Sequence, residues 1–513
     1  MMRLLLANPG YAQTFWSLNK VLKGLGKKVL APPLGLLTLA ALLPNAWDLR
    51  LVELTARPLT EDDWAWCDAI FVTGMGVQYS GIIETIREGR RRGKTVVVGG
   101  PWVFHWPQEA LSAGADIVVK GEGELAVTPL LKALAGGDSG IVIEATERPD
   151  LAQSRVPRYD LLDMDLYVEM DVQFSRGCPF QCEFCDITLI YGRKVRTKSP
   201  RQILTELQTL YDLGWRRFVF IVDDNFIGDP LRTKELLREL VPWMHQRGHP
   251  FDFATQASVN LAADAEMLDL MAQAGFYRVF LGIESPDEES LRSTKKYQNV
   301  AADLDQVCEK ITRAGLQIIA GCIVGFDNES PGVDQRLLDF AERNHIPEMF
   351  VTMLQVGPGT QLYLRLEREG RLLSRAFDDN LGSQTGLINF VPTRPLEQIV
   401  EEFIHLQEVL YEPGFFLERT FRHFSMMKHP PFKKGFQPPY WRELWATMII
   451  FFRQGVLYPS RWKFWKCILM GLVRFPRRLP HFVTGCIMAE HYFDYVRTIR
   501  EKLQEQMKQI GTE

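Results

Sequence analysis

Short apolar runs alternate with amphipathic helical patterns from the N-terminus to about residue 355, and this alternation limits the possible folds more than any other feature of the sequence. Runs of this kind are typical of strands that are buried on both faces. Strands that alternate with helices form parallel sheets, with the ligand site at the carboxyl ends of the strands. The sequence therefore predicts an α/β protein.

The alternation falls into two blocks. The first block predicts a doubly wound parallel sheet, with strands over residues 2–6, 49–54, 69–73, 95–98 and 117–120 and helices over 34–43 and 82–92. The second block predicts a partial or full (βα) barrel, with strands over 168–174, 218–222, 252–257, 279–283, 318–323 and 349–355 and helices such as 200–212 and 232–246.

Three cysteines lie in the loop that follows the first strand of the second block. Cys178, Cys182 and Cys185 have the spacing CxxxCxxC, and no fourth cysteine lies nearby. Four thiolates complete the ligand set of an iron–sulfur cluster, so three leave one iron of a cubane open to another ligand. Two alternatives stay open: a zinc site completed by a distant histidine, because none lies between His105 and His245, and a chance cluster of structural thiols.

Composition indicates a folded protein of several domains, with 46% hydrophobic and 24% charged residues in a chain of 513. Eight cysteines are too few for a disulfide framework, and no signal peptide opens the chain. We therefore expect a cytoplasmic protein, with peripheral contact to the inner membrane as a further option. The net charge of −4 gives no reason to expect a nucleic-acid partner.

With Phe184 directly before its third cysteine, the cysteine segment resembles the radical SAM enzymes. The resemblance implies that Cys178, Cys182 and Cys185 hold a [4Fe-4S] cluster and that S-adenosyl-L-methionine chelates the open iron. Reductive cleavage then gives a 5′-deoxyadenosyl radical, which requires an electron donor such as flavodoxin or ferredoxin. Phe184 is implied to lie beside the adenine.

Polar and small residues at the ends of the predicted barrel strands match further positions of that family. Asp223, Asp224 and Asn225 stand where the family binds the methionine amino group, and Glu284 stands where it contacts the ribose or the methionine moiety. The other matching positions are Gln256, Ser258, Gly321 and Ile323. Taken alone, an acid such as Asp223 or Glu284 is as readily a helix N-cap or a surface residue.

The loops after the strands of the first block are rich in glycine, which lets backbone approach a large ligand. By periodicity alone the first block indicates a nucleotide- or flavin-binding sheet, or a receiver-like module. Read with the cysteines, the Gly-Gly-Pro segment at 99–101 and the Gly-Glu-Gly-Glu segment at 121–124 resemble the cobalamin-binding subfamily of radical SAM enzymes. That resemblance implies cobalamin contacts at Asn8, Gly74, Gly99, Gly100, Gly121 and Glu122.

The loop after the first strand carries no Asp-x-His-x-x-Gly, so no histidine is placed there to bind cobalt from below. In the subfamily this absence accompanies base-off cobalamin, which favours nucleophilic cob(I)alamin. His105, with Trp102, Phe104 and Trp106, follows the fourth predicted strand. These side chains either line the corrin or simply pack at a helix start.

The C-terminal region differs in charge and composition from the rest. Residues 413–513 contain 17 Lys and Arg against 7 Asp and Glu, with many Trp and Phe among them, and helices are predicted over 396–410 and 490–510. Such a segment fits a membrane interface or a cover over a greasy substrate channel at the barrel mouth. An ordinary helical subdomain with snorkelling basic residues fits equally well.

Together these features predict a cobalamin-binding domain (1–145), a radical SAM core (157–374) and a helical C-terminal cap (375–513). The chain is identified as a member of the cobalamin-dependent radical SAM methyltransferases, and Phe15-Trp16 with the segment 32–38 is similar to the hopanoid C-2 methylase group. We expect methylation of an unactivated carbon of a hydrophobic, isoprenoid-like substrate. The alternatives are a cyclase or oxidase of the anaerobic porphyrin-ester cyclase kind, and a non-catalytic cobalamin-binding scaffold with a structural metal.

Overall fold

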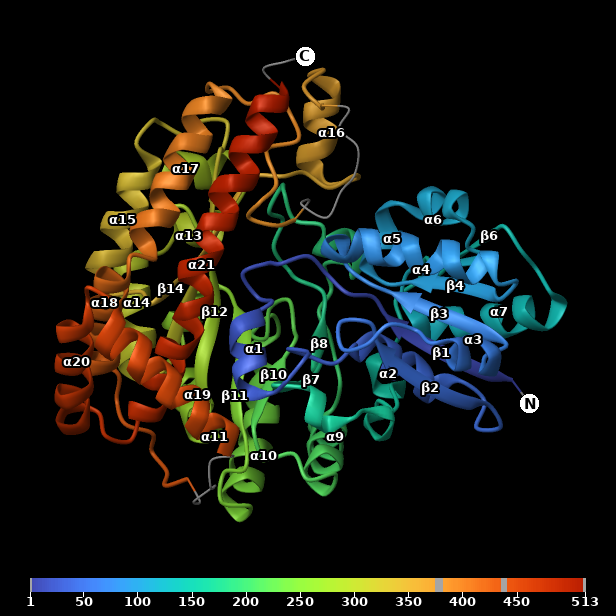
Figure 1. Cartoon of the computed structure of the whole chain (residues 1–513), viewed down its shortest axis with the longest axis horizontal. Helices are drawn as coiled ribbons and strands as arrows, with labels where there is room; N and C mark the ends of the chain where they lie inside the picture. The colour runs from blue at the N-terminus through green and yellow to red at the C-terminus, as the bar shows by residue number, and fades with distance from the viewer. Residues whose placement is uncertain (1, 374–381, 435–440, 511–513) are drawn as a thin grey trace.

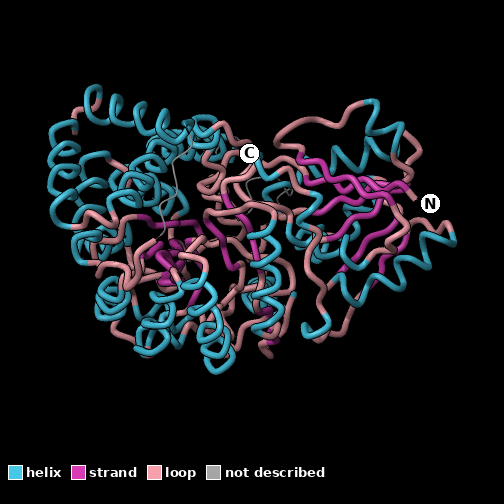
Figure 2. The backbone as a smooth tube through the Cα atoms, turned by 90° about the horizontal axis from the view of Figure 1, so that it is seen from below, coloured by secondary structure: helices cyan, strands magenta, loops and turns pink. Residues whose placement is uncertain are grey.

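The computed structural model describes residues 2–373, 382–434 and 441–510 (Figure 1). Two parallel six-stranded sheets lie next to each other, and a layer of long helices covers the second sheet on the side away from the first. Figure 2 shows that loops occupy most of the space between the two sheets. The predicted boundary at residue 374 lies outside the described residues.

The first sheet is the predicted doubly wound sheet. Its strands pair in the order β2-β1-β3-β4-β5-β6, and all neighbours are parallel. The strands are β1 (Arg3–Asn8), β2 (Asp48–Glu53), β3 (Ala69–Thr73), β4 (Thr95–Gly99), β5 (Ile117–Lys120) and β6 (Ile141–Glu144). Only β6 was not predicted, because its side chains are partly exposed and its apolar run is short.

Successive side chains of these strands serve two separate cores, as the period of two requires. Leu5, Ile70 and Val96 pack under α4 (Tyr79–Arg91) and α6 (Pro107–Ala113) on one face. Leu4, Phe71 and Val97 pack under α2 (Leu34–Leu42) and α7 (Gly123–Gly136) on the other. Both faces are therefore closed, and the loops at the carboxyl edge remain for a ligand.

The second sheet is an open barrel. Its strands pair in parallel in the order β14-β13-β12-β11-β10-β7, and no pairing joins β14 to β7 within the described residues. The strands are β7 (Glu169–Val172), β10 (Phe218–Ile221), β11 (Asp252–Ala257), β12 (Phe276–Glu284), β13 (Gln317–Val324) and β14 (Glu348–Met353). The outer helices include α9 (Pro200–Asp212), α10 (Pro230–Gln246), α11 (Ala265–Ala274), α14 (Leu304–Ala314) and α15 (Val333–Arg343).

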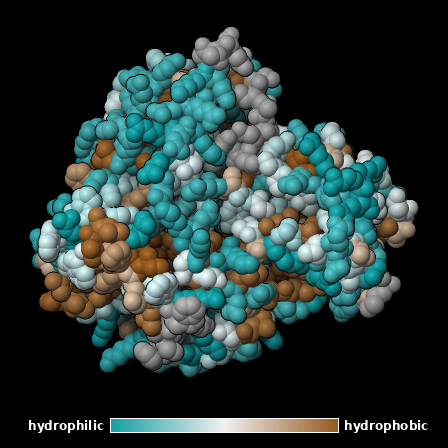
Figure 3. Space-filling model, in the orientation of Figure 1, coloured by the Kyte–Doolittle hydropathy of each residue, from teal (hydrophilic) through white to brown (hydrophobic). Residues whose placement is uncertain are grey.

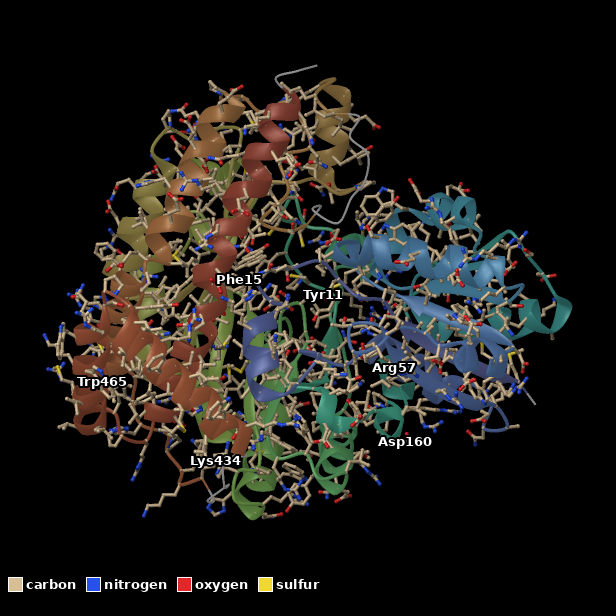
Figure 4. All side chains as sticks on the ribbon, in the orientation of Figure 1. Tyr11, Phe15, Arg57, Asp160, Lys434 and Trp465 are labelled. Carbon is tan, nitrogen blue, oxygen red and sulfur yellow. The ribbon has the colours of Figure 1, made fainter. Side chains whose placement is uncertain are left out.

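An N-terminal segment leaves the first sheet and packs against the barrel, which the sequence did not reveal. Phe15 lies beside α21 (Figure 4), where it stacks on Tyr492 with ring centroids 4.3 Å apart. Trp16 packs beside Phe350 of β14. The following helix, α1 (Asn19–Leu25), lies against the C-terminal helices. Residues 1–145 therefore contribute one segment to the core of the other two regions.

The C-terminal helices are α17 (Leu396–Leu410), α18 (Pro413–Met426), α19 (Trp441–Phe452), α20 (Arg461–Arg474) and α21 (Leu479–Ile510), with a π-turn over Arg453–Leu457. α18 lies at the amino ends of the barrel strands, where Arg419 Nε donates to the Ile346 carbonyl just before β14. Lys434 pairs with Asp252 at the start of β11. α18 and the segment at Lys434 therefore lie at the ends of the strands opposite the barrel mouth, whereas the far end of α21 contacts Thr385 through Gln506.

Candidate active site

The cysteine loop lies at the carboxyl end of β7. Ser175–Arg176 (β8) pairs antiparallel with Arg196–Thr197 (β9), and this two-stranded ribbon closes the loop that carries the three cysteines. Gly177 has a φ of 94°, and a Cβ there would come within 2.9 Å of the Gly192 and Lys194 carbonyl oxygens. Only glycine therefore fits before Cys178.

Asp223 anchors this loop from behind. It is fully buried, and its carboxylate accepts hydrogen bonds from the backbone N–H groups of Phe174 (2.7 Å) and Ser175 (2.8 Å) and from the Ser175 hydroxyl (2.6 Å). Both oxygens are therefore occupied by the protein. Asp223 thus positions the cysteine loop in this structure, rather than presenting a free oxygen for the predicted contact with a methionine amino group.

Asp224, the next residue, has the opposite environment. Its Oδ2 is buried without a hydrogen-bond partner in the described structure. Burial, the neighbouring Asp223 and Asp186 together raise the pKa of Asp224 to about 7. A buried carboxylate oxygen without a donor favours a cationic group as its partner.

The loop after β12 forms the other wall of the site. Glu284 ends the strand with a φ of 63°, where the pairing of β12 with β13 is irregular, and it forms an ion pair with Lys296. The Lys296 ammonium lies 6.0 Å from the ring centroid of Phe184. Burial opposes the charge of Lys296, but the carboxylate of Glu284 and negative charge on the sulfurs of Cys182 and Cys185 outweigh it, so its pKa is raised.

The same segment touches the cysteine loop directly. Gln298 Nε2 donates to the Cys182 sulfur at 3.5 Å, and the Thr294 carbonyl accepts from the Glu183 backbone N–H at 2.9 Å. Sequence reasoning missed Gln298 and Lys296, and the only signal available was their position shortly after a strand that ends in Glu284.

Replacing Gln298 with Leu is expected to lower the reduction potential of a cluster held by these thiols, because a hydrogen bond to a ligand sulfur stabilises the more negative, reduced state. A hydrogen bond of about 1 kcal/mol corresponds to roughly 40 mV for one electron. Redox titration followed by electron paramagnetic resonance measures this shift. Tyr297→Leu, at an exposed neighbour, is the matched control, and equal potentials in both variants would contradict the prediction.

Loops of the first sheet form ion pairs with the β8–β9 ribbon beside the cysteines. The carboxylate of Glu122 pairs with Arg176 (2.6 Å) and Arg196 (2.7 Å), and Glu124 pairs with Arg176 at 2.8 Å. His105 bonds through Nδ1 to the Pro358 carbonyl (3.0 Å) and through Nε2 to Asp186 (3.2 Å). Glu122 and His105, both considered as cobalamin contacts, therefore join loops of the first sheet to the cysteine loop and its ribbon in this structure.

The remaining loops of the first sheet form a polar edge. Glu53 accepts from Asn8 Nδ2 (2.8 Å) and from the Tyr167 hydroxyl (2.7 Å), and burial raises the pKa of Glu53 to about 7. Two buried donors, Thr55 Oγ1 and Trp102 Nε1, have no hydrogen-bond partner in the described structure. They follow β2 and β4 on this edge and could donate to the amide groups of a bound corrinoid.

The glycines predicted as cobalamin contacts lie where neighbouring loops of the first sheet pack closely together. A Cβ on Gly100 would clash with Thr73 and Gly74, one on Gly121 would come within 2.6 Å of the Ala145 carbonyl oxygen, and one on Gly74 would meet Ile82 at 2.7 Å. At Gly99 a Cβ would meet only Val119, at ordinary distance. Close packing of protein therefore accounts for three of these four glycines.

The last predicted residues lie at the carboxyl ends of the barrel strands. Asn225 Oδ1 accepts from the Ser258 backbone N–H at 3.1 Å, and the Gln256 carbonyl accepts from Phe226 N at 2.9 Å. A Cβ on Gly321 would meet the Phe280 ring at 2.6 Å. Ile323 is half-buried near the end of β13.

The donor set agrees with a cluster. Cys178, Cys182 and Cys185 are unpaired and half-buried thiols in one loop. Within the part of the chain that the structure describes, no three His, Cys, Asp or Glu side chains converge as ligands of one metal ion. The thiolates of a cubane each bind a different iron, so three thiols can hold a cluster with one open iron. Asp224 could hold the ammonium of S-adenosylmethionine beside such a cluster.

The fold and the site combine a three-cysteine loop at the carboxyl edge of an open barrel with a second, doubly wound domain, as expected for an iron–sulfur enzyme with two cofactor domains. Models described as the radical SAM superfamily, the B12 binding domain and a domain of unknown function (DUF4070) match residues 172–341, 28–131 and 360–505. An uncharacterised methyltransferase of Synechocystis sp. is 46% identical over 99% of this chain and 94% of its own length.

The hopanoid C-2 methylase of Rhodopseudomonas palustris is 32% identical over 91% of this chain and 88% of its own length. The solved structure of TsrM, a radical S-adenosylmethionine methyltransferase from Kitasatospora setae with cobalamin and a [4Fe-4S] cluster bound, has the same fold, with a TM-score of 0.63 over 98% of this chain and 100% of that one at 15% identity. The chain belongs to the cobalamin-binding radical SAM methyltransferases. Its cofactors are a [4Fe-4S] cluster, S-adenosylmethionine and cobalamin.

Proposed function

We propose that this enzyme methylates an unactivated carbon of an isoprenoid lipid, with a hopanoid as the most specific candidate. The observation that carries the proposal is the similarity to a hopanoid C-2 methylase, which extends over 91% of the chain. The similarity therefore includes residues outside the two regions that match the radical SAM and B12-binding models. A carbon without a leaving group cannot be methylated by simple displacement, so radical chemistry and a methyl carrier are both needed.

In this proposal the chain's own residues position the cofactors. Cys178, Cys182 and Cys185 hold the cluster, whose chemistry with S-adenosylmethionine supplies a radical that removes a hydrogen atom from the substrate. Asp224 binds the methionine ammonium, and Phe184 lies beside the adenine. Thr55 and Trp102 donate to the corrinoid. The pairs of Glu122 with Arg176 and Arg196 fix the two cofactors relative to each other.

Incubation of the reconstituted enzyme with methyl-labelled S-adenosylmethionine, cobalamin, a chemical reductant and a hopene tests the proposal. We expect a labelled product in which one hydrogen of the hopene is replaced by a methyl group, together with 5′-deoxyadenosine. A product labelled on a different lipid from a cell extract would replace the substrate assignment. Cleavage with no methyl label in any product would instead favour the cyclase or oxidase alternative. A flavodoxin or ferredoxin stays a predicted electron donor in the cell.

The pKa of Asp224 gives a prediction for cofactor binding. In the absence of ligand its pKa of about 7 lies above the usual value for an aspartate, so Asp224 is mostly protonated below pH 7. The unfolded chain already loses this proton near pH 4, so the free energy of unfolding decreases as the pH rises from about 4 to about 7. Because only the ionised form pairs with an ammonium, affinity for S-adenosylmethionine is expected to rise about fivefold between pH 6 and 7.

Asp224→Asn is expected to remove this pH dependence, to weaken S-adenosylmethionine binding and to stabilise the ligand-free protein above pH 7. Isothermal titration calorimetry at the two pH values and thermal unfolding measure these effects. Asp229→Asn, at a helix N-cap outside the site, serves as the control for loss of one carboxylate. An Asp224→Asn protein that keeps both the affinity and its pH dependence would rule out this role.

A further inference from the structure

The helical hairpin of α19, the π-turn Arg453–Leu457 and α20 has one buried face and one exposed face. Ile450, Phe464, Cys467 and Ile468 pack inward against α18 and α21. On the other face the side chains are large, apolar and exposed, including Trp462 (75% exposed) and Val473 (82%). The hairpin is thus held firmly by the protein while it presents an apolar surface to solvent.

This surface is concentrated, not scattered. Of the nineteen large apolar side chains that are exposed among the described residues, ten lie between residues 444 and 473. They are Leu444, Trp445, Met448, Phe452, Val456, Leu457, Trp462, Leu469, Leu472 and Val473. Figure 3 shows an apolar patch over α19 and α20, at the lower left. Contiguous apolar patches of this kind mark interaction sites on folded proteins.

The charge of the hairpin identifies the partner. Residues 442–478 contain eight Arg and Lys and a single acid, Glu443, which pairs with Arg217 at 2.6 Å. Four of the exposed basic residues have no carboxylate partner among the described residues: Arg461, Lys466, Arg474 and Arg477. A surface that combines exposed Trp and Leu with unpaired Arg and Lys matches the headgroup region of an anionic bilayer, where apolar side chains insert and basic ones meet phosphate.

We propose that this hairpin is a docking surface for anionic lipid bilayers and that the enzyme binds a membrane peripherally through it. In the described part of the chain no helix combines the length and apolarity needed to cross a bilayer. The helices of the hairpin therefore lie along the interface, with Trp462, Leu469 and Val473 in the outer part of the lipid. Trp465 of the hairpin lies on the opposite side of the molecule from Arg57, which follows β2 of the first sheet (Figure 4).

Docking here leaves the active site free. Glu443 of α19 pairs with Arg217 directly before β10, and α20 packs on α18, so the hairpin lies at the amino ends of the barrel strands, whereas the cysteines lie at the carboxyl ends. Membrane binding is therefore independent of the cofactors and of the substrate assignment. It keeps the enzyme at a lipid surface while the barrel mouth faces the cobalamin domain.

Co-sedimentation of the full-length holoenzyme with vesicles tests the proposal. We expect binding to vesicles of phosphatidylglycerol and phosphatidylcholine, much weaker binding to pure phosphatidylcholine, and weakening by salt. The triple variant Trp462→Ser, Leu469→Ser, Val473→Ser and the double variant Lys466→Glu, Arg474→Glu are each expected to reduce binding by at least about tenfold. Leu231→Ser, at a side chain 76% exposed on α10, is the control and should bind like the unaltered protein.

Circular dichroism and retained cluster absorbance establish that the variants are folded. The proposal is overturned if the unaltered enzyme does not bind anionic vesicles, or if the triple and double variants bind as well as the control. It is also overturned if size-exclusion chromatography shows a dimer that the triple variant dissociates and vesicle binding is absent, because the apolar face then covers a second copy. These readouts do not depend on methylation, so they separate this proposal from the proposed substrate.

Discussion

Replacing Cys182 with Ala is expected to abolish both the iron–sulfur cluster and the cleavage of S-adenosylmethionine. Cys182 is one of only three thiols in the loop, and a cubane held by two protein ligands is not retained. We expect loss of the visible absorbance of the reconstituted cluster and a decrease in 5′-deoxyadenosine formation of at least about a thousandfold, the scale of losing an essential cofactor. Absorbance spectroscopy and chromatography of the nucleoside measure the two effects.

Cobalamin binding should survive this change, since the cofactor domain has its own two-sided core. Cys467→Ala, a buried cysteine in the C-terminal helices, provides the control for loss of a thiol and should keep the cluster. Retained cleavage in Cys182→Ala would refute the assignment of the cysteine loop. Loss of the cluster in Cys467→Ala would show instead that cluster assembly is sensitive to general destabilisation.

Glu122→Gln is expected to separate the two halves of the enzyme functionally. Its carboxylate is almost fully buried against Arg176 and Arg196, which are themselves about nine-tenths buried, so the variant leaves buried guanidinium charge undercompensated. Removing one partner of a buried ion pair costs about 3–5 kcal/mol. We therefore expect a clear decrease in thermal stability and in cobalamin affinity, although Glu122 itself offers no free oxygen to the cofactor.

In catalysis, Glu122→Gln is expected to uncouple cleavage of S-adenosylmethionine from methylation of the substrate. If the ion pairs only align the cobalamin domain with the cysteine loop, 5′-deoxyadenosine should still form while the ratio of methylated product to nucleoside falls. Glu144→Gln, which removes a half-exposed pair with Lys120, should cost at most about 1 kcal/mol and leave the ratio unchanged. An unchanged ratio and an unchanged stability in Glu122→Gln would exclude the alignment role.

The sequence alone was sufficient for the elements whose periodicity is strong. The residues of β3, β5, β11, α9 and α17 agree with their predicted ranges, because each buries a continuous run or stripe of its own side chains. The N-terminal segment escaped prediction because Phe15 is buried, and Trp16 partly buried, by residues of β14 and α21, far along the chain. No local period reports such a contact.

The candidate active site likewise has features that the sequence alone predicts and features that only the tertiary structure shows. The class of chemistry could be read from three thiols in one loop, since the number and spacing of ligands are local properties of the chain. Which of the two adjacent acids has a free carboxylate oxygen could not be read from the sequence. Asp223 and Asp224 are adjacent, yet only the tertiary structure shows that Ser175, 48 residues away, occupies Asp223 and leaves Asp224 with an unpartnered oxygen.

The same limit applies to Glu122, whose guanidinium partner Arg176 is 54 residues away, and to Gln298, which reaches Cys182 across 116 residues. A motif indicates which residue types a cofactor needs, but hydrogen bonds between distant segments decide which of their atoms remain free. Thus the sequence by itself determined a radical enzyme with a cobalamin domain. Only the tertiary structure decided which polar atoms remain without a partner, which side chains join the domains, and that the apolar face of the C-terminal hairpin is exposed, because burial is a property of the whole packed chain.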